Sequence, residues 1–156
     1  MGMEIERKFL VTSDAWRKAV TGVHYSQGYI AGDSAATVRV RVAGDAAWLT
    51  IKGLTTGVSR PEFEYQIPLD EARYMLNHLC RRPLIDKHRH FIDIEGLTWE
   101  VDEFHCENAG LVVAELELED ESQSFTRPSW LGKEITEDHR YRNSNLGVTP
   151  FTTWPR

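Results

Sequence analysis

Charged side chains alternate with mostly apolar ones along several short stretches, as in Val38-Arg39-Val40-Arg41, Glu62-Phe63-Glu64 and Trp99-Glu100-Val101-Asp102. Residues i and i+2 of a β-strand lie on the same face, about 6.6 Å apart. Each stretch is therefore expected to form a strand that projects two charges in one direction.

The charged positions fall into an acidic and a basic set. The carboxylates are Glu4, Glu6, Glu62, Glu64, Glu100, Asp102, Glu115 and Glu117, and the bases are Lys8, Arg39, Arg41, Lys52, Lys87 and Arg89. A single pair of this kind usually lies on a solvated outer face, because charged residues mostly stay exposed. Here acidic pairs and basic pairs occupy different strands, which favours two facing walls over a mixed outer surface.

These residue types indicate phosphate and metal chemistry. Carboxylates without histidine or cysteine suit a hard ion such as Mg²⁺ or Mn²⁺. Arginine binds phosphate through two N–H groups, and lysine binds it as a point charge. Because an isolated buried ion costs several kcal/mol, the two walls together would need a polyanion and a divalent cation. Phosphoryl transfer to water is the simplest reaction that such a site supports.

The alternation predicts eight strands and few helices. We expect strands at 3–11, 23–31, 36–43, 46–53, 60–68, 85–94, 97–104 and 110–119, and helices at 13–20, 70–80 and 137–145. Short turns such as Gly44-Asp45 and Glu95-Gly96 favour antiparallel neighbours. A sheet that closes with its charged face inward needs helices over its apolar outer face. The predicted fold is α+β and mainly antiparallel, an eight-stranded closed tunnel barrel with a charged interior and helices packed outside.

Composition limits the other function classes. The chain has 156 residues, 41% of them hydrophobic, and a formal net charge of −6. That length fits one domain over residues 1–156, and the acidic balance argues against a duplex nucleic-acid binder. No signal peptide or run of about 18 apolar residues occurs, and Cys80 and Cys106 have no disulfide-framework or zinc spacing. We expect a cytoplasmic monomer or homodimer that binds neither nucleic acid nor membrane.

Two other signals carry less weight. His88 and His90 could ligate a transition metal, but they have the opposite parity from Lys87 and Arg89. We therefore expect both histidines on the outer face of their strand. No GxxxxGK[ST] phosphate loop occurs in the sequence.

The opening Glu4-Ile5-Glu6-Arg7-Lys8 resembles the ExExK signature of the CYTH superfamily, the triphosphate tunnel metalloenzymes, and of its small bacterial inorganic triphosphatase-like members. The similarity continues through Gln27-Gly28-Tyr29, Val38-Arg39-Val40-Arg41, Thr50-Ile51-Lys52, Glu62-Phe63-Glu64-Tyr65, Lys87-His88-Arg89, Trp99-Glu100-Val101-Asp102, Glu115-Leu116-Glu117, Gly132-Lys133-Glu134-Ile135-Thr136 and Tyr141-Arg142-Asn143. One ExExK motif alone would be weak support. The ordered set spans essentially the whole chain.

The resemblance implies a role for each matching residue. Glu4, Glu6, Glu115 and Glu117 would hold the metal, Mg²⁺ or Mn²⁺, while Glu62, Glu64, Glu100 and Asp102 would be further tunnel acids. Lys8, Arg39, Arg41, Lys52, Lys87 and Arg89 would bind the triphosphate. Some members are proposed to use a lysine–tyrosine dyad, which here would be Lys52 with Tyr29.

Several activities are compatible with this resemblance. The small size and close charge pairs favour hydrolysis of inorganic tripolyphosphate to pyrophosphate and phosphate by metal-activated water. A class IV adenylyl cyclase and a thiamine triphosphatase are the enzymatic alternatives, although the cyclase branch carries a His-Phe variant where this chain has Met1-Gly2-Met3. A polyphosphate- or nucleotide-binding module is the non-enzymatic alternative. It would gain nothing from four metal-side carboxylates, which repel the ligand without a metal.

Overall fold

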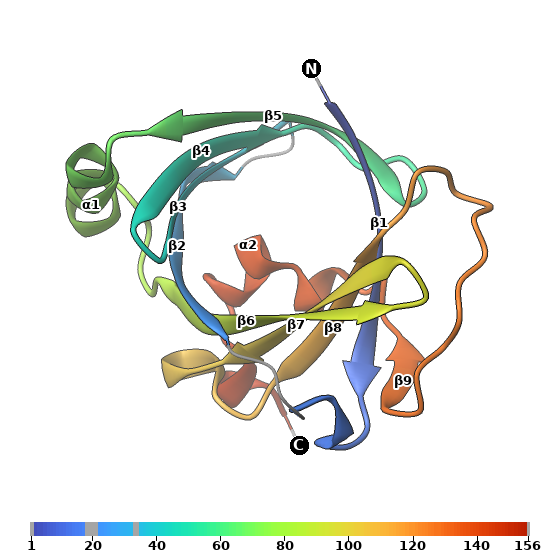
Figure 1. The fold of residues 1–156 in the computed structure, drawn as a ribbon. Coiled ribbons are helices and arrows are strands. Elements are labelled where there is room, and N and C mark those ends of the chain that lie inside the picture. Colours follow the sequence, from blue (N-terminus) through green and yellow to red (C-terminus); the bar gives the residue numbers. More distant parts are fainter. Residues whose placement is uncertain (1, 18–21, 33–34, 156) are drawn as a thin grey trace.

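Nine antiparallel strands form one continuous sheet in the part of the chain that the computed structural model describes, residues 2–17, 22–32 and 35–155. Their order is β5-β4-β3-β2-β6-β7-β8-β1-β9, and β1 also pairs with β5, which closes all but β9 into a barrel. Figure 1 looks into the resulting ring. The predicted closed eight-stranded barrel is confirmed.

The elements have the following bounds. The strands are β1 (Gly2–Val11), β2 (Val23–Gly32), β3 (Thr37–Ala43), β4 (Ala46–Lys52), β5 (Ser59–Ile67), β6 (Ile85–Ile94), β7 (Leu97–Phe104), β8 (Val112–Glu117) and β9 (Leu131–Glu134). The α-helices are α1 (Leu69–His78) and α2 (Asn143–Leu146), and the 3₁₀ turns are η1 (Ala15–Arg17), η2 (Cys106–Asn108), η3 (His139–Tyr141) and η4 (Phe151–Thr153). Over the described ranges, no helix has the length and apolar character needed to cross a membrane.

The predicted strands agree with β1 to β8 to within two residues at each end, and the helix predicted at 70–80 is α1. The strand predicted at 110–119 is shorter, because Gly110 turns the chain with a φ of +95° and β8 begins only at Val112. β9 was not expected. It adds to β1 beyond the barrel and pairs Phe9 with Glu134.

Two of the predicted helices were wrong. The helix at 13–20 is only the turn η1 within the described residues, and 18–20 lie outside them. This segment is tied to the barrel by the Thr12 N–H, which donates to the Trp130 carbonyl, and by the buried Trp16. The helix at 137–145 is instead η3 followed by α2, because Arg142 between them is extended with a ψ of 136°.

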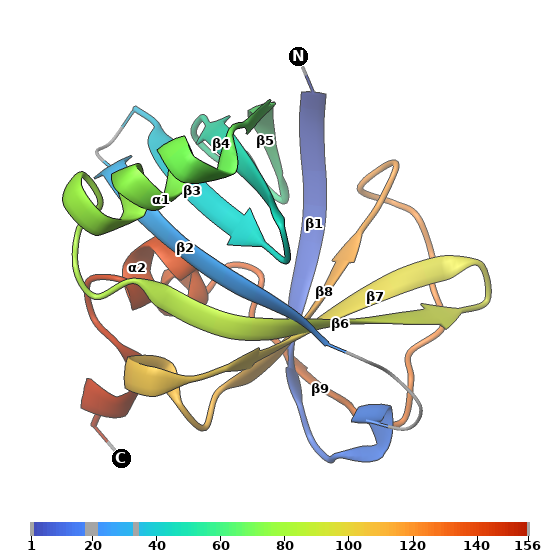
Figure 2. The same ribbon diagram turned by 60° about the vertical axis from the view of Figure 1, so that its left-hand side comes forward.

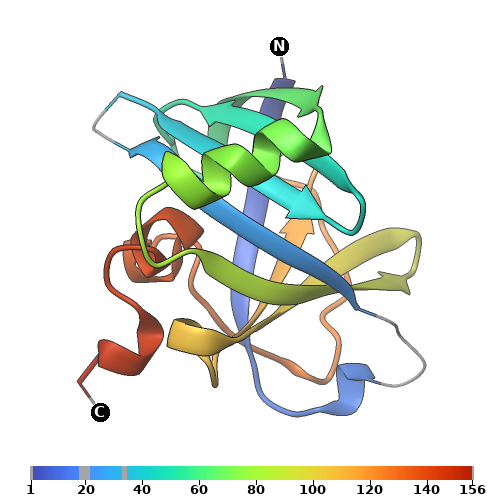
Figure 3. The same cartoon turned by 90° about the vertical axis from the view of Figure 1, so that its left-hand side faces the viewer.

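Apolar side chains of the outer face fix which residues point inward. Helix α1 lies across β2, β3 and β4 on the outside of the barrel (Figure 3), where Ala72 and Leu76 pack against Val40 and Ala47. Because alternate residues of a strand point to opposite faces, the neighbours of Val40 on β3 face the interior. On the far side, Phe9, Trp16, Trp99 and Trp130 belong to a second buried outer cluster.

One end of the interior is apolar rather than charged. Ile85, Phe104 and Val113 form a buried cluster with Ile135 and with Leu146 of α2. The first three continue the inward parity of their strands beyond the charged positions. The chain from η3 onward therefore packs against this end of the barrel, and Figures 1 and 2 show α2 beside the ends of β2 and β6.

Candidate active site

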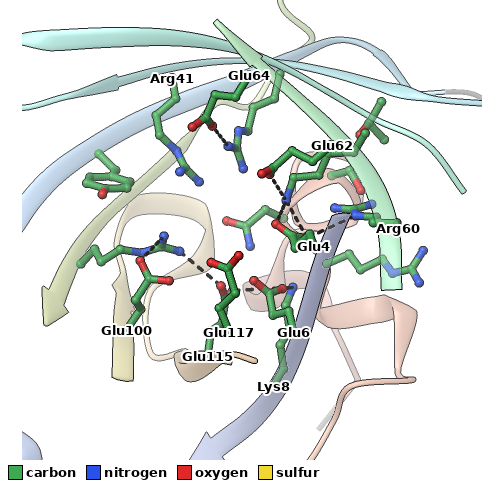
Figure 4. A pocket seen from close by; sticks show the side chains of 18 of the residues that line it. Glu4, Glu6, Lys8, Arg41, Arg60, Glu62, Glu64, Glu100, Glu115 and Glu117 are labelled. Atoms are coloured by element: carbon green, nitrogen blue, oxygen red, sulfur yellow. Dashed lines mark hydrogen bonds and ion pairs between the residues drawn. The ribbon is translucent and has the colours of Figure 1, made fainter. Parts of the chain in front are cut away.

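The barrel interior contains a cavity of about 210 Å³. Its wall includes all of the predicted site residues except Asp102, namely Glu4, Glu6, Lys8, Tyr29, Arg39, Arg41, Lys52, Glu62, Glu64, Lys87, Arg89, Glu100, Glu115 and Glu117. Figure 4 shows the labelled side chains projecting from the surrounding strands toward one another. The parity of charges along separate strands thus brings these groups into one site.

Acidic and basic strands occupy two contiguous arcs of the barrel. The basic arc is β4-β3-β2-β6, with Lys52, Arg39, Arg41, Lys87 and Arg89. The acidic arc is β7-β8-β1-β5, with Glu100, Glu115, Glu117, Glu4, Glu6, Glu62 and Glu64. Lys8 on β1 and Arg60 on β5 are cations within the acidic arc. The two predicted walls are present, and each spans neighbouring strands.

Carboxylates of the acidic arc face one another directly across strand pairs. Glu6 is opposite Glu117 in the β1–β8 register, and Glu100 is opposite Glu115 in the β7–β8 register. Like charges in directly opposed positions destabilise a sheet. Burial, together with the charges of Glu115 and Glu4, raises the pKa of Glu6 to about 8, and burial and Glu4 also raise the pKa of Glu117.

Glu4 and Glu115 are held as anions by cations beside them. Lys52 Nζ donates to both oxygens of Glu4 at 3.0 and 2.8 Å, and Arg60 Nε lies 3.5 Å from Glu4 Oε1. Burial acts to raise the pKa of Glu4, but these cations outweigh it and lower that pKa to about 2. Lys8 Nζ lies 3.7 Å from Glu115 Oε1, and Lys8 and Arg89 lower the pKa of Glu115 against the effect of burial.

Glu4, Glu6, Glu115 and Glu117 line one cavity and offer carboxylate oxygens, the ligand type that suits a hard divalent ion. Over the described ranges, no group of three or more His, Cys, Asp and Glu side chains is already arranged as a metal shell. Instead these carboxylates pair with cations such as Lys52 and Lys8. A bound cation would replace those partners.

Lys87 and Arg89 share one buried carboxylate. Lys87 Nζ donates to Asp102 at 2.7 Å, and Arg89 donates to the same group from Nε at 2.7 Å and from Nη2 at 2.9 Å. Asp102 is fully buried and lies outside the cavity lining, so the structure places it behind the two bases rather than in the tunnel. Burial, with Arg89 and Arg41 nearby, lowers the pKa of Lys87 to about 7, although Asp102 opposes this.

Arg39 and Arg41 project from β3 into the same cavity. Arg39 Nη2 lies 3.6 Å from Glu64 Oε2, and Arg41 Nε donates to Gln27 Oε1 at 2.7 Å. Burial lowers the pKa of Arg41, and repulsion by the cations Arg39 and Arg89 lowers it further. An anion in the cavity would relieve that repulsion.

The predicted dyad residues line one cavity but differ in their surroundings. Lys52 is bound to Glu4, and its Nζ also lies 3.5 Å from Glu62 Oε2. Tyr29 lies on β2, which β3 separates from the β4 strand of Lys52, and it interacts electrostatically with Lys8 and Arg41. Both histidines considered above lie outside this lining, as their parity predicts.

The cavity also contains residues that the sequence reasoning missed: Tyr25, Thr37, Arg60, Arg142, Asn143 and Ser144. Arg60 has the parity of Glu62 and Glu64, and Tyr25 has the parity of Tyr29, so extending the alternation by one step to Arg60 and by two steps to Tyr25 would have found both. Residues 142–144 lie outside the strands of the barrel, and no periodicity marks them as inward-facing.

Comparisons with known proteins agree with this geometry. The CYTH domain family model matches residues 2–147. Two relatives named inorganic triphosphatase are 53% identical over 97% of this chain and 97% of the protein from Acetivibrio thermocellus, and 34% identical over 94% of this chain and 97% of the protein from Nitrosomonas europaea.

Solved structures show the same barrel. A crystal structure of an inorganic triphosphatase superposes with a TM-score of 0.68 and 31% identity, covering 95% of this chain and 96% of that one. A Hippeastrum protein described as a putative adenylyl cyclase with a dominant triphosphatase activity has a TM-score of 0.57 and 15% identity, covering 75% of this chain and 80% of that one, and supports the fold alone. The cavity, its two charged arcs and the match over residues 2–147 agree, and the chain belongs to the CYTH domain family.

Proposed function

We propose that the protein is a metal-dependent triphosphatase that hydrolyses inorganic tripolyphosphate to pyrophosphate and phosphate. The observation that carries the proposal is the single cavity in which a contiguous basic arc faces a contiguous acidic arc. The basic arc suits a polyanion, and the acidic arc suits a divalent cation. The names of the two relatives support the reaction and the substrate.

Glu4, Glu6, Glu115 and Glu117 would hold Mg²⁺ or Mn²⁺. When bound, the ion supplies charge neutralisation on phosphate oxygens and makes a water molecule more acidic. The chain contributes the placement of these carboxylates on β1 and β8, where Glu6 faces Glu117 across the strand pair. Lys8, on the same face of β1, compensates the charge of Glu115.

The basic arc binds and orients the phosphate chain. Its Arg39, Arg41 and Arg89 offer guanidinium N–H groups, and its Lys52 and Lys87 offer ammonium groups, as does Lys8 from the acidic arc, all on the cavity wall. Proton transfer is assigned to Lys52 with Tyr29, and Lys87 is a second candidate because its pKa of about 7 lets it gain or lose a proton near neutral pH.

The lining favours an inorganic chain over a nucleotide or thiamine ester. The ring of Tyr25 is part of the cavity wall, and the guanidinium carbons of Arg41 and Arg89 lie 4.8 and 5.1 Å from its centre. These cations occupy the position from which a base would stack on that ring. We propose that the protein binds a small-molecule triphosphate and neither nucleic acid nor membrane. We also propose that it is a monomer or homodimer in the cytoplasm.

The test is phosphate release by the purified protein from tripolyphosphate, pyrophosphate, ATP and thiamine triphosphate, each with Mg²⁺, with Mn²⁺ and with chelator. We expect tripolyphosphate to give the highest kcat/KM and chelator to abolish turnover. Cyclic AMP formation from ATP would indicate a cyclase instead. Tight tripolyphosphate binding without metal-dependent turnover would indicate a binding module.

A further inference from the structure

The C-terminal segment contributes a neutral amide to the basic arc. Asn143, the first residue of α2, lines the cavity, and its Oδ1 accepts from Lys87 Nζ at 2.9 Å and from Gln27 Nε2 at 3.2 Å. Gln27 is fully buried, and its Oε1 accepts from Arg41 Nε at 2.7 Å. The two amides therefore form a continuous link between Arg41 on β3 and Lys87 on β6.

The cations at its ends fix the direction of this link. A lysine ammonium and an arginine guanidinium are donors without acceptors, so each must meet a carbonyl oxygen. This requirement points Asn143 Oδ1 at Lys87 and Gln27 Oε1 at Arg41. The Gln27 amide group is then left to donate to Asn143, as observed. A flip of either amide would set two donors against each other.

The contacts of Lys87 account for two of its three N–H donors. One donates to Asp102 and one to Asn143, so a third remains for a ligand; the side chain is fully buried in the cavity wall. The charged and titratable groups around it are Asp102 from β7, Arg89 from β6, Arg41 from β3 and Glu115 from β8, and the Tyr25 ring of β2 lies 5.9 Å away. The acceptor from α2 is uncharged.

We propose that Asn143 is a positioning residue of the active site, which directs Lys87 and, through Gln27, Arg41 toward the bound phosphate chain. A carboxylate at this position would pair with Lys87 and hold it as a cation, whereas the neutral amide orients the ammonium without adding charge. The catalytic consequence rests on the proposed function. The positioning of Lys87 itself is measurable without turnover.

The experiment compares Asn143→Asp with Asn143→Leu. Asp keeps the acceptor and adds a negative charge, so the pKa of Lys87 should rise by about 1 to 3 units. Leu removes the acceptor at similar size, so that pKa should fall. The readout is an NMR pH titration of lysine side chains labelled with ¹³C at Cε, with the Lys87 signal assigned from Lys87→Arg.

The matched control is Asn145→Ala on the same helix, because Asn145 Nδ2 donates to the Arg140 carbonyl at 3.2 Å rather than to a cavity residue. We expect the wild-type midpoint for Lys87 in this variant. If Asn143→Asp does not fold, the Lys87 midpoint in Asn143→Leu is compared with that in Asn145→Leu. The proposal then requires a lower midpoint in Asn143→Leu and the wild-type midpoint in Asn145→Leu. Opposite shifts in the Asp and Leu variants cannot come from a general loosening of α2, which would move both alike.

An unchanged Lys87 midpoint in folded Asn143→Asp, or shifts of the same direction in both Asn143 variants, would overturn the proposal. The pH profile of kcat/KM with tripolyphosphate separates the role of Asn143 from the proposed function. The limb of this profile near pH 7 should shift together with the Lys87 midpoint that NMR measures in each variant. Shifted midpoints in a protein that releases no phosphate would leave Asn143 as a positioning residue and refute the triphosphatase.

Discussion

Glu6 is the residue at which the acidic arc is most crowded. Its carboxyl group faces Glu117 across the β1–β8 pair, and burial with Glu115 and Glu4 nearby raises its pKa to about 8. The carboxyl is therefore mostly protonated at pH 7 in the metal-free protein. A metal ligand must be deprotonated, so the ion competes with that proton.

Metal binding should consequently release protons. At pH 7 we expect Mn²⁺ to displace close to one proton per protein, and this number should fall toward zero above pH 9, where Glu6 is already ionised. Calorimetric titrations in buffers of different ionisation enthalpy measure the released protons. Glu6→Gln should release fewer protons and bind Mn²⁺ more weakly, while the exposed Glu107→Gln should match the wild type. Proton release that does not depend on Glu6 would refute this assignment.

The same residue predicts a pH dependence of stability. A folded-state pKa of about 8, above the ordinary glutamate value of 4.5, means that Glu6 contributes stability fully below pH 4.5 and loses it as the pH rises through 8. Gln at this position cannot ionise. The free energy of unfolding of metal-free Glu6→Gln, relative to wild type, should therefore increase between pH 5 and pH 9. Urea unfolding at both pH values measures it, and a difference that stays constant or decreases would contradict the prediction.

At the scale of the elements, the inward residues followed from strand parity. The alternation predicted the strands carrying the charges and the outward position of His88 and His90, because a strand has only two faces. The same alternation also marks the apolar end of the barrel, which was not predicted from the sequence. Ile85, Phe104 and Val113 have the parity of the charged residues, and their apolar character marks the end of the barrel against which Leu146 packs.

Other elements could not be predicted from local pattern. β9 has four residues and forms because β1 extends past its partner β5, which pairs only with residues 2–5 and leaves that edge of β1 open at Phe9 and Val11; this is a property of the closed barrel. The turn η1 depends on the burial of Trp16 against Trp99 and Trp130. Such tertiary contacts override local helix preference, so the 13–20 pattern was misleading.

β3 gives a prediction about substrate length. Arg39 and Arg41 both project from this strand into the cavity, so a phosphate chain along it can contact both. Arg41→Ala should raise KM for tripolyphosphate about 10- to 100-fold, matching the about 1.5–3 kcal/mol of a charged hydrogen bond. Inhibition by pyrophosphate, which is too short to span all the bases, should weaken less. Arg73→Ala on α1, outside the cavity, is the control. Equal losses for the two ligands would argue against an extended bound chain.

At the scale of the whole molecule, barrel closure decides which charges meet. The sequence shows acidic and basic strands but not which strands are neighbours, and it is the pairing of β1 with both β8 and β5 that joins the acidic strands into one arc. The contribution of residues 142–144 likewise depends on how the C-terminal segment packs across the end of the barrel. Both features depend on long-range contacts, which cannot be predicted from the alternation of residues along a single strand.

The opposed arcs predict that the two ligands stabilise the fold together. Each alone adds charge of one sign, whereas metal and polyanion together neutralise both arcs, and a ligand that binds only the folded state raises Tm. Mn²⁺ with a slowly hydrolysed tripolyphosphate analogue should raise Tm by more than the sum of the separate increases. Calorimetric scans of the four combinations measure this, and a merely additive increase would mean that the arcs bind independently.

The most direct measurement is metal-dependent phosphate release from tripolyphosphate by wild type, Glu6→Gln and Glu107→Gln at equal folded concentration. The two substitutions make the same chemical change, a carboxyl group to an amide, one in the acidic arc and one on the exposed surface. The wild type and Glu107→Gln should turn over alike with Mg²⁺ or Mn²⁺, and Glu6→Gln should lose about 100-fold or more, because a hard ion loses an anionic ligand. Undiminished metal-dependent hydrolysis by folded Glu6→Gln would contradict the assignment of the acidic arc as the metal site.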